Sequence, residues 1–146
     1  MGDVSAAVGS HTKVAAQRVV ESYYAAFNAR NFAGMLDFLS EQVAHDINQG
    51  EREVGIAAFK TFLGRMDVAY SETLRDIVIC VDASGTRVAA EFIVDGTYLQ
   101  ADPGFPAAHG QKYTLPAATF FEVHDGKIGR VTTYYNLQDW LRQVAA

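Results

Sequence analysis

The sequence has one cysteine and few basic residues, and each of these scarcities excludes a class of protein. A single cysteine, Cys80, rules out an intramolecular disulfide, and its place in the apolar segment 77–81 predicts a thiol buried in a strand. A reducing, cytoplasmic setting is therefore expected. The 12 lysines and arginines are dispersed and outnumbered by 17 acidic residues, giving a formal net charge of −5. Because nucleic-acid surfaces need clustered positive charge, no nucleic-acid partner is expected.

Long apolar runs are also missing. No stretch approaches the roughly 20 residues that a membrane helix needs, so no membrane association is expected. The opening residues do not have the basic, apolar and cleavage-site order of a secretory signal. The four histidines and the cysteine show no metal-ligand spacing, and no phosphate-binding glycine motif is present. We therefore expect neither a metal nor a cofactor.

The residues that are present predict one folded domain. The chain has 146 residues and is 49% hydrophobic, which is enough to bury a single core without disulfides or a structural metal. The first 11 residues carry too few apolar groups to pack, so residues 1–11 are predicted to be a disordered tail. Residues 12–146 are predicted to form the domain.

Helical periodicity occurs in four places. Apolar residues at spacings of three and four predict an amphipathic helix over residues 13–29. Asn31 and Asn136 are expected to cap two shorter helices, because an asparagine side chain can accept a hydrogen bond from the first turn. Gly55 opens a further amphipathic helix, whose apolar stripe includes Phe59 and Leu63.

Four long segments are rich in β-branched and aromatic residues and predict strands joined by tight turns. They are residues 70–82, 86–100, 112–123 and 127–135. The connection over residues 101–110 contains two prolines and two glycines, which excludes a strand there; it is expected to be a lid or a surface excursion. The order of elements predicts a segregated α+β fold: a curved antiparallel sheet with three N-terminal helices over its concave face and a short C-terminal helix.

A short strand near residues 43–48 carries two polar side chains, Asp46 and Asn48. Because they are two residues apart, they share one face of the strand. One interpretation places Asp46 in a pocket as a general base with a raised pKa; another pairs it with Arg52 at the strand end. His45 would then face the other way, as a structural histidine.

This arrangement resembles the cone-shaped, cystatin-like fold of the nuclear-transport-factor-2-like superfamily. Within it, the chain is most similar to the ketosteroid isomerase and SnoaL-like polyketide cyclase branch, over residues 14–143. The resemblance is carried by VVESYYAAFNA (19–29), by the Asp46 strand with GIAAF (55–59), and by DGKI (125–128) leading to YYNL (134–137).

The resemblance implies a site. In ketosteroid isomerases an aspartate moves a proton, while a tyrosine and a protonated aspartic acid hold the substrate oxygen. Position by position, the tyrosine falls on Tyr23 and the base on Asp46. The second oxygen-binding acid falls on Ala118, which has no carboxyl. Substrate contacts are implied for Asn48, Phe59, Leu63, Phe92, Val94, Ala118, Thr133 and Tyr135.

Two other branches match less well. The water-activating residues of the related epoxide hydrolases fall near Phe92, Val94 and Thr133, none of which is ionisable. Of their helper pair, only Asn48 is present. The acid that polyketide cyclases place on the last strand again falls on Thr133.

Three functions follow as expectations. The first is a cofactor-free pocket enzyme that isomerises or cyclises an apolar, steroid- or polyketide-like carbonyl compound, with Asp46 as base and Tyr23 as hydrogen-bond donor. The second is a binding domain without turnover, because the second acid is missing. The third is a dimeric scaffold, since the outer face of the sheet is expected to form a homodimer.

Overall fold

The computed structural model describes residues 4–145. Within this range the chain forms four helices and six strands. In order, they are α1 (Val4–Asn28), α2 (Phe32–Leu36), β1 (Leu39–Ile47), β2 (Glu53–Val54), α3 (Ile56–Ala69), β3 (Tyr70–Val81), β4 (Arg87–Tyr98), β5 (Gln111–His124), β6 (Lys127–Tyr135) and α4 (Leu137–Val144).

The six strands form one curved, open sheet in the order β2-β1-β6-β5-β4-β3. The last four strands are a meander of antiparallel neighbours, as predicted, and their bounds agree with the prediction to within two residues. The expectation of a wholly antiparallel sheet is wrong at one pair, because β1 and β6 run parallel. The reason is the path of the chain: α3 carries it from β1 to the opposite edge, and the meander returns to β1 with β6 pointing the same way.

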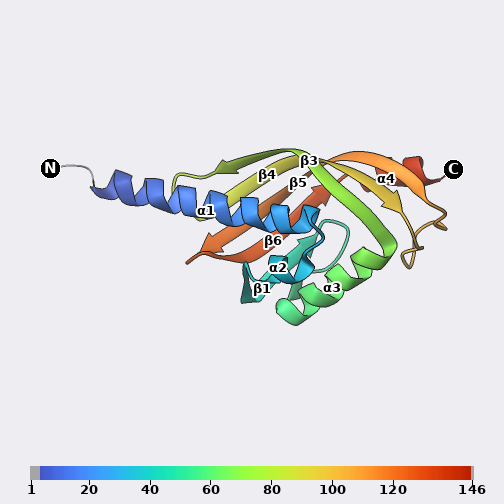
Figure 1. Ribbon diagram of the computed structural model, residues 1–146, viewed down its shortest axis with the longest axis horizontal. Helices are drawn as coiled ribbons and strands as arrows, with labels where there is room; N and C mark the ends of the chain where they lie inside the picture. Colours follow the sequence, from blue (N-terminus) through green and yellow to red (C-terminus); the bar gives the residue numbers. More distant parts are fainter. Residues whose placement is uncertain (1–3, 146) are drawn as a thin grey trace.

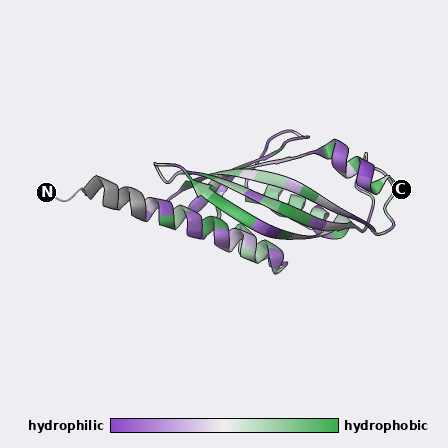
Figure 2. Cartoon of the chain, turned by 90° about the horizontal axis from the view of Figure 1, so that it is seen from above, coloured by the Kyte–Doolittle hydropathy of each residue, from purple (hydrophilic) through white to green (hydrophobic). Residues whose placement is uncertain are grey.

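The helices lie on the concave side of the sheet, so the molecule has the layered form that the resemblance implied (Figure 1). Helix α1 runs beside β3 and β4, α3 lies below it, and α4 sits at the end where the C-terminus lies (Figure 1). Seen from above, the strands carry hydrophobic and hydrophilic residues interspersed, as expected for a sheet with one covered face (Figure 2).

Local capping agrees with the sequence. The Asn31 side chain accepts a hydrogen bond from the Gly34 N–H at 2.9 Å, and the Asn136 side chain accepts one from the Asp139 N–H at 3.1 Å. Helix α3 begins directly after Gly55, whose φ of 103° suits a residue without a Cβ. These three of the four predicted helix starts are confirmed.

The predicted tail differs from the structure. Helix α1 begins at Val4, whereas residues 1–11 were expected to be disordered; residues 1–3 lie outside the described part of the chain. A helix that is already fixed by packing further along extends at little cost, because each added residue gains a hydrogen bond without a new nucleus. No helix within residues 4–145 is both long enough and apolar enough to cross a membrane.

A bulge in β3 decides which of its side chains face inward. Before it, Leu74 is buried and faces the helices; at Asp76 the backbone adopts φ 54° and the pairing with β4 shifts. Past the bulge the alternation is reversed, so Val78 and Cys80 are exposed. The prediction that Cys80 is buried is therefore wrong, since the extra residue turns the strand by one position.

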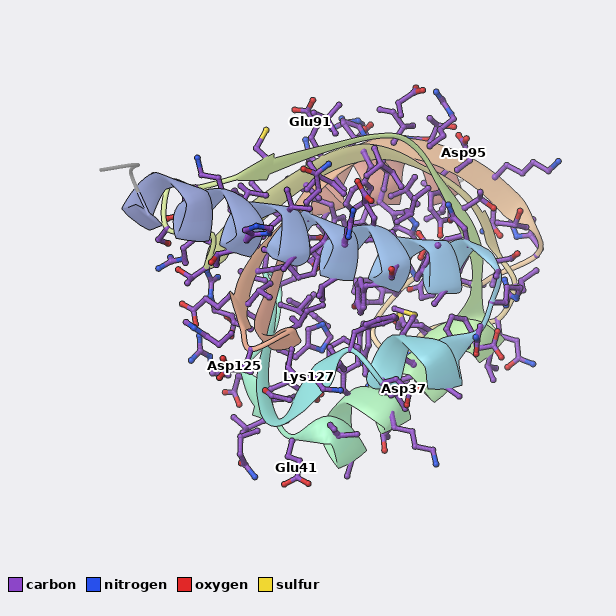
Figure 3. The ribbon with its side chains drawn as sticks, turned by 60° about the vertical axis from the view of Figure 1, so that its left-hand side comes forward. Asp37, Glu41, Glu91, Asp95, Asp125 and Lys127 are labelled. Atoms are coloured by element: carbon purple, nitrogen blue, oxygen red, sulfur yellow. The ribbon has the colours of Figure 1, made fainter. Side chains whose placement is uncertain are left out.

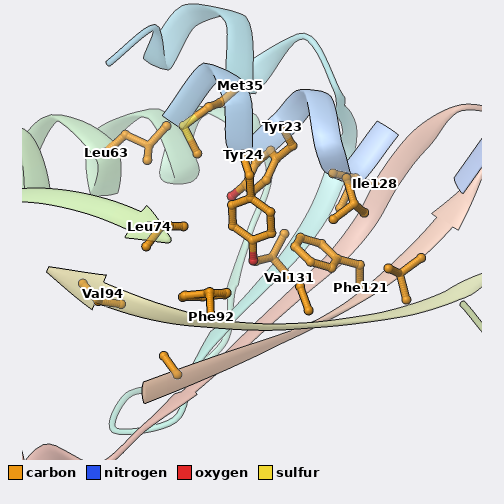
Figure 4. Close-up of a cluster of buried hydrophobic side chains, with 14 of the residues drawn as sticks. Tyr23, Tyr24, Met35, Leu63, Leu74, Phe92, Val94, Phe121, Ile128 and Val131 are labelled. Atoms are coloured by element: carbon orange, nitrogen blue, oxygen red, sulfur yellow. The ribbon is translucent and has the colours of Figure 1, made fainter. Parts of the chain in front are cut away.

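The centre of the core is a set of rings stacked edge to face (Figure 4). Tyr23 and Tyr24 of α1 lie 5.7 and 5.8 Å from the ring of Phe121, and Tyr24 also lies 5.3 Å from the ring of Phe92. Phe121 has no exposed surface. Such ring pairs add to the free energy gained from burial alone.

We expect Phe121→Ala to lower the free energy of unfolding by about 3–5 kcal/mol, because it leaves a large cavity among rings that cannot close over it. Phe120, its neighbour on β5, is 40% exposed on the outer face. Phe120→Ala is the matched control and should change stability by less than about 1 kcal/mol. Urea unfolding followed by circular dichroism measures both; similar losses would contradict this account of the core.

Candidate functional site

The helices and the concave face of the sheet enclose a cavity of about 370 Å³. Its wall is mostly apolar, and its volume is within the range of small-molecule pockets. Arg30, Gln49, Arg65 and Asp67 line it and are exposed, so it opens to solvent beside α3 and the turn after β1.

Seven of the predicted site residues lie in this wall. They come from α1, α3, β4 and β6, which the fold brings around one space. They are Tyr23, Phe59, Leu63, Phe92, Val94, Thr133 and Tyr135.

Asp46 does not face the cavity, and the interpretation of it as a pocket base is wrong. It lies on the outer face of β1, where its carboxylate accepts two hydrogen bonds from Arg52, at 2.7 and 3.0 Å, and one from Thr132 at 2.8 Å. These hydrogen bonds, led by those from Arg52, lower the pKa of Asp46. A carboxylate held in this way is a poor proton acceptor near neutral pH.

The buried residues near Asp46 show which face of β1 points toward the helices. Val43 and His45 are buried against the helices, so the even-numbered neighbours point outward. Asn48 is exposed for the same reason and is not part of the wall. The predicted substrate contact of Ala118 is also wrong, because Ala117 and Thr119 are the residues of β5 that face inward.

An acid that does face the cavity from the sheet is Glu72 on β3. It forms one row across three strands with Gly96 of β4 and Tyr113 of β5. A Cβ atom on Gly96 would lie 2.2 Å from Cζ of Tyr113, so the phenol ring occupies space that only glycine leaves. The Tyr113 hydroxyl thereby reaches across β4 toward the Glu72 carboxyl, close enough for each group to shift the pKa of the other.

Burial controls the charge of Glu72. Its side chain is half-buried by accessible surface, because part of it borders the cavity, but the carboxyl is enclosed by surrounding protein. This desolvation raises the pKa of Glu72 to about 7, against a smaller lowering by the neighbouring Tyr113 hydroxyl. A carboxyl with this pKa can accept or release a proton near neutral pH.

Other acidic groups of the sheet point away from the cavity. Glu91 and Asp95 of β4 lie on the outer side, on the far side of the sheet from α1 (Figure 3). Asp95 accepts hydrogen bonds from Arg75 at 2.6 Å and from Thr114 at 3.0 Å, and they lower its pKa. Neither acid lines the cavity.

The loop over residues 101–110 closes one end of the cavity and is fastened there. The Tyr98 hydroxyl donates to the Pro106 carbonyl oxygen at 2.7 Å and accepts from the Asp102 N–H at 2.9 Å. The Tyr70 hydroxyl donates to the Asp102 carboxylate at 2.9 Å. Of the two expectations for this loop, a lid or mouth of the pocket is closer to the structure than a surface excursion, since Asp102 and Phe105 line the cavity.

At the other end of the cavity lies His45, for which the sequence predicts a structural role. Its ring lies 4.4 Å from Phe59 and 4.5 Å from Phe62, and only 5% of the residue is exposed. Burial lowers the pKa of His45 to about 4, so the imidazole is neutral. Nδ1 of His45 has no hydrogen-bond partner within the described chain.

Tyr24, the neighbour of the predicted site residue Tyr23, also has a buried polar atom without a hydrogen-bond partner. Its hydroxyl is buried and has no partner in residues 4–145; Thr119 lies beside it, outside hydrogen-bond geometry. Burial raises the pKa of both Tyr23 and Tyr24, so both phenols stay protonated. No group of three potential metal ligands occurs in the described residues.

Comparison with known proteins places this fold and cavity in a family. The family model for the SnoaL-like domain matches residues 20–131. The chain belongs to the SnoaL-like domain family. No curated protein matches it.

Several solved structures that are similar to this SnoaL-like domain are named as enzymes. A proposed polyketide cyclase from Pseudomonas putida is 55% identical, with 88% of this chain and 97% of that chain covered and a TM-score of 0.87. A second one, from Xanthomonas campestris, is 53% identical, with 91% and 98% covered and a TM-score of 0.88. An epoxide hydrolase from M. tuberculosis shares the fold at 20% identity, 91% coverage of each chain and a TM-score of 0.73.

The raised pKa of Glu72 predicts a pH-dependent stability. Ionisation of Glu72 is costlier in the folded than in the unfolded chain, so its contribution is fully present below pH 4.5 and is lost as the pH rises to about 7. Relative to Glu72→Gln, the wild type should lose roughly 2–3 kcal/mol over this range. Urea unfolding at pH 4.5 and 8 measures the difference. Glu91→Gln, at an exposed carboxyl, should retain the wild-type dependence; a Glu72→Gln profile parallel to wild type would refute the shift.

The contact between Gly96 and Tyr113 gives a second test. Gly96→Ala should destabilise the protein by about 1–3 kcal/mol, because the added methyl group collides with the Tyr113 ring. It should also raise the pKa of Glu72, since the displaced hydroxyl no longer favours the carboxylate. Gly64→Ala is the control: no atom lies within 4 Å of the added group, and alanine favours the helix there. Carbon-13 titration of the glutamate carboxyls reads the pKa.

Proposed function

We propose that this SnoaL-like domain is a small cofactor-free enzyme that transfers a proton within an apolar carbonyl compound, with Glu72 as the proton-transferring group. The observation that supports this is a carboxyl with a pKa of about 7 in the wall of a mostly apolar cavity. Such a group is half-ionised near neutral pH, where a general base combines availability with basicity.

The reaction would begin at a carbon next to the carbonyl group. The Glu72 carboxylate removes a proton from that carbon, and the electron pair of the C–H bond passes to the carbonyl oxygen, giving an enolate. In an isomerisation, Glu72 returns the proton to a different carbon. In a cyclisation, the enolate carbon attacks a second carbonyl of the same molecule, and Glu72 returns the proton to the new alkoxide oxygen.

The enolate oxygen needs a hydrogen-bond donor beside Glu72. We assign this role to Tyr135, one of the predicted substrate contacts. Its phenol lines the cavity, and burial, helped by the charges of Glu72 and Asp102, raises its pKa. Tyr135 is thus close to the proposed base and protonated at neutral pH.

This proposal keeps the reaction class expected from the sequence and changes the residue. Asp46 is bound to Arg52 on the outer face and so has no access to a ligand in the cavity. Tyr23 stays in the wall, where it packs against Phe121 in the half of the cavity away from Glu72. Its predicted contact with a substrate oxygen remains a prediction.

Deuterium exchange tests the proton transfer directly. The wild-type protein is incubated in D2O with a β,γ-unsaturated 3-ketosteroid, and deuterium uptake and conversion to the conjugated ketone are followed by mass spectrometry and ultraviolet absorbance. Glu72→Gln should lower the rate by about 10²- to 10⁴-fold, because the amide cannot accept the proton. Asp46→Asn should retain the wild-type rate.

Two results would count against the proposal. Equal rates for wild type and Glu72→Gln would remove Glu72 as the base. A wild-type protein that is stabilised by the ketone against heat, but exchanges no deuterium, would favour the alternative of a binding domain without turnover. For the active protein, kcat/KM should rise with pH through about 7, since the base must be ionised in the free enzyme.

The homodimer through the sheet stays a separate prediction. The outer face carries three large exposed hydrophobic residues, Val78, Phe120 and Tyr134, and the last two contact each other with ring centroids 5.6 Å apart. An exposed patch of this kind supports contact with a second copy.

A further inference from the structure

We infer that Arg65, at the opening of the cavity, binds a carboxylate at the outer end of the ligand. This inference deepens the proposed function and rests on it only for the position of the ligand's carbonyl group beside Glu72. It names the ligand class: an apolar carbonyl compound that carries an ionised carboxyl group at the end remote from the reacting carbonyl.

The first argument is the charge at the opening. Two arginines and one aspartate line it, namely Arg30, Arg65 and Asp67, and all three are exposed. Arg30 forms an ion pair with Asp67 and donates a hydrogen bond to Oγ of Ser71 at 3.2 Å, so these two charges compensate each other. The guanidinium of Arg65 has no ion pair or hydrogen-bond partner within residues 4–145. One positive charge is therefore left without a counter-charge here, although the whole chain has a net charge of −5.

The second argument is the way in which Arg65 is held. Its guanidinium carbon lies 5.7 Å from the centre of the Phe62 ring, which also lines the cavity. A ring face attracts a guanidinium and leaves its N–H groups free to donate. Because the fork of N–H groups matches the two oxygens of a carboxylate, one arginine is enough to bind this anion. A phosphate dianion would need a second cation, and Arg30 is already paired.

The third argument is the separation of Arg65 from Glu72. The Phe62 ring beneath Arg65 also contacts His45 of β1, with centroids 4.5 Å apart. Glu72 lies on β3, four strand spacings from β1, which is about 19 Å around the curved sheet. Along the chain, helix and strand geometry keep the Cα atoms of Arg65 and Glu72 within about 16 Å of each other. One molecule with a body of about three or four fused rings can therefore contact both groups.

The closed end of the cavity excludes the reverse orientation. Glu72 and Asp102 line that end, and the only arginines or lysines among the described lining residues are Arg30 and Arg65, at the opening. A carboxylate at the closed end would be desolvated beside acidic groups without a compensating cation. At the opening it stays hydrated on one side and pairs with Arg65 on the other.

The test uses two 3-ketosteroids with a carboxyl group, one directly on the last ring and one at the end of a short side chain. The primary amide of each acid has the same shape without the charge. Binding to the wild type is measured by calorimetry at neutral pH and low ionic strength. We expect at least one acid to bind about three- to tenfold more tightly than its own amide, the gain of a charge-assisted contact that is partly solvated. This preference should fall to within about twofold in about 0.5 M salt, because the pair is exposed to screening.

Arg65→Gln should abolish most of the preference and leave the affinity for the amides within about twofold of wild type. Lys60→Gln is the matched control: Lys60 is exposed on the same helix, is not one of the lining residues, and its loss changes the net charge equally. It should retain the preference. Equal affinity of the wild type for each acid and its amide, binding of none of the four steroids, an unchanged preference in Arg65→Gln, or an equal loss in Lys60→Gln would overturn the inference.

Failure here is distinguishable from failure of the proposed function, because binding requires no turnover. Glu72→Gln should retain the preference for the acid even though it has lost deuterium exchange. A wild-type protein that exchanges deuterium but prefers neither acid over its amide would keep the proposed function and overturn the role of Arg65.

Discussion

The cavity depends on how α1 rests against the sheet. The helix meets the concave face through aromatic rings set edge to face, Tyr23 and Tyr24 against Phe92 and Phe121. Large rigid rings hold a helix farther from a strand than small side chains would, and they do so with a fixed geometry. The curved sheet therefore encloses a space beside these rings, and α3 covers the part that α1 leaves open (Figure 1).

Within that space the polar groups are few and unusually placed. Glu72 lies in an apolar wall beside the phenol of Tyr113, and the position of that phenol depends on the missing side chain of Gly96. Buried groups of this kind reduce stability, and such sites persist in proteins where a ligand or a reaction uses them. The SnoaL-like fold thus supplies the enclosure, and a handful of inward positions supply its chemistry.

Much of the fold could be predicted because its signals are local. Caps at Asn31 and Asn136 and the strand composition need only neighbouring residues. The site could not be predicted in the same way, because tertiary packing decides which side chains of a strand face the cavity. His45 and Asp46 are both polar, so the sequence does not show which of them faces inward, and a shift of one position exchanges them. Glu72 could have been found from its spacing of two to Leu74, but its partner lies two strands away, at Tyr113.

The fastening of the loop over residues 101–110 bears on how a ligand travels. Tyr98 bonds to both Asp102 and Pro106, so this end of the cavity is shut by three hydrogen bonds that include the one from Tyr70. The exposed lining residues, such as Arg30, Gln49 and Arg65, lie instead at the ends of α1 and α3 and in the turn after β1. A ligand therefore enters and leaves through the same opening. A long molecule enters lengthwise and leaves by the same path, so a second molecule binds only after the first is released.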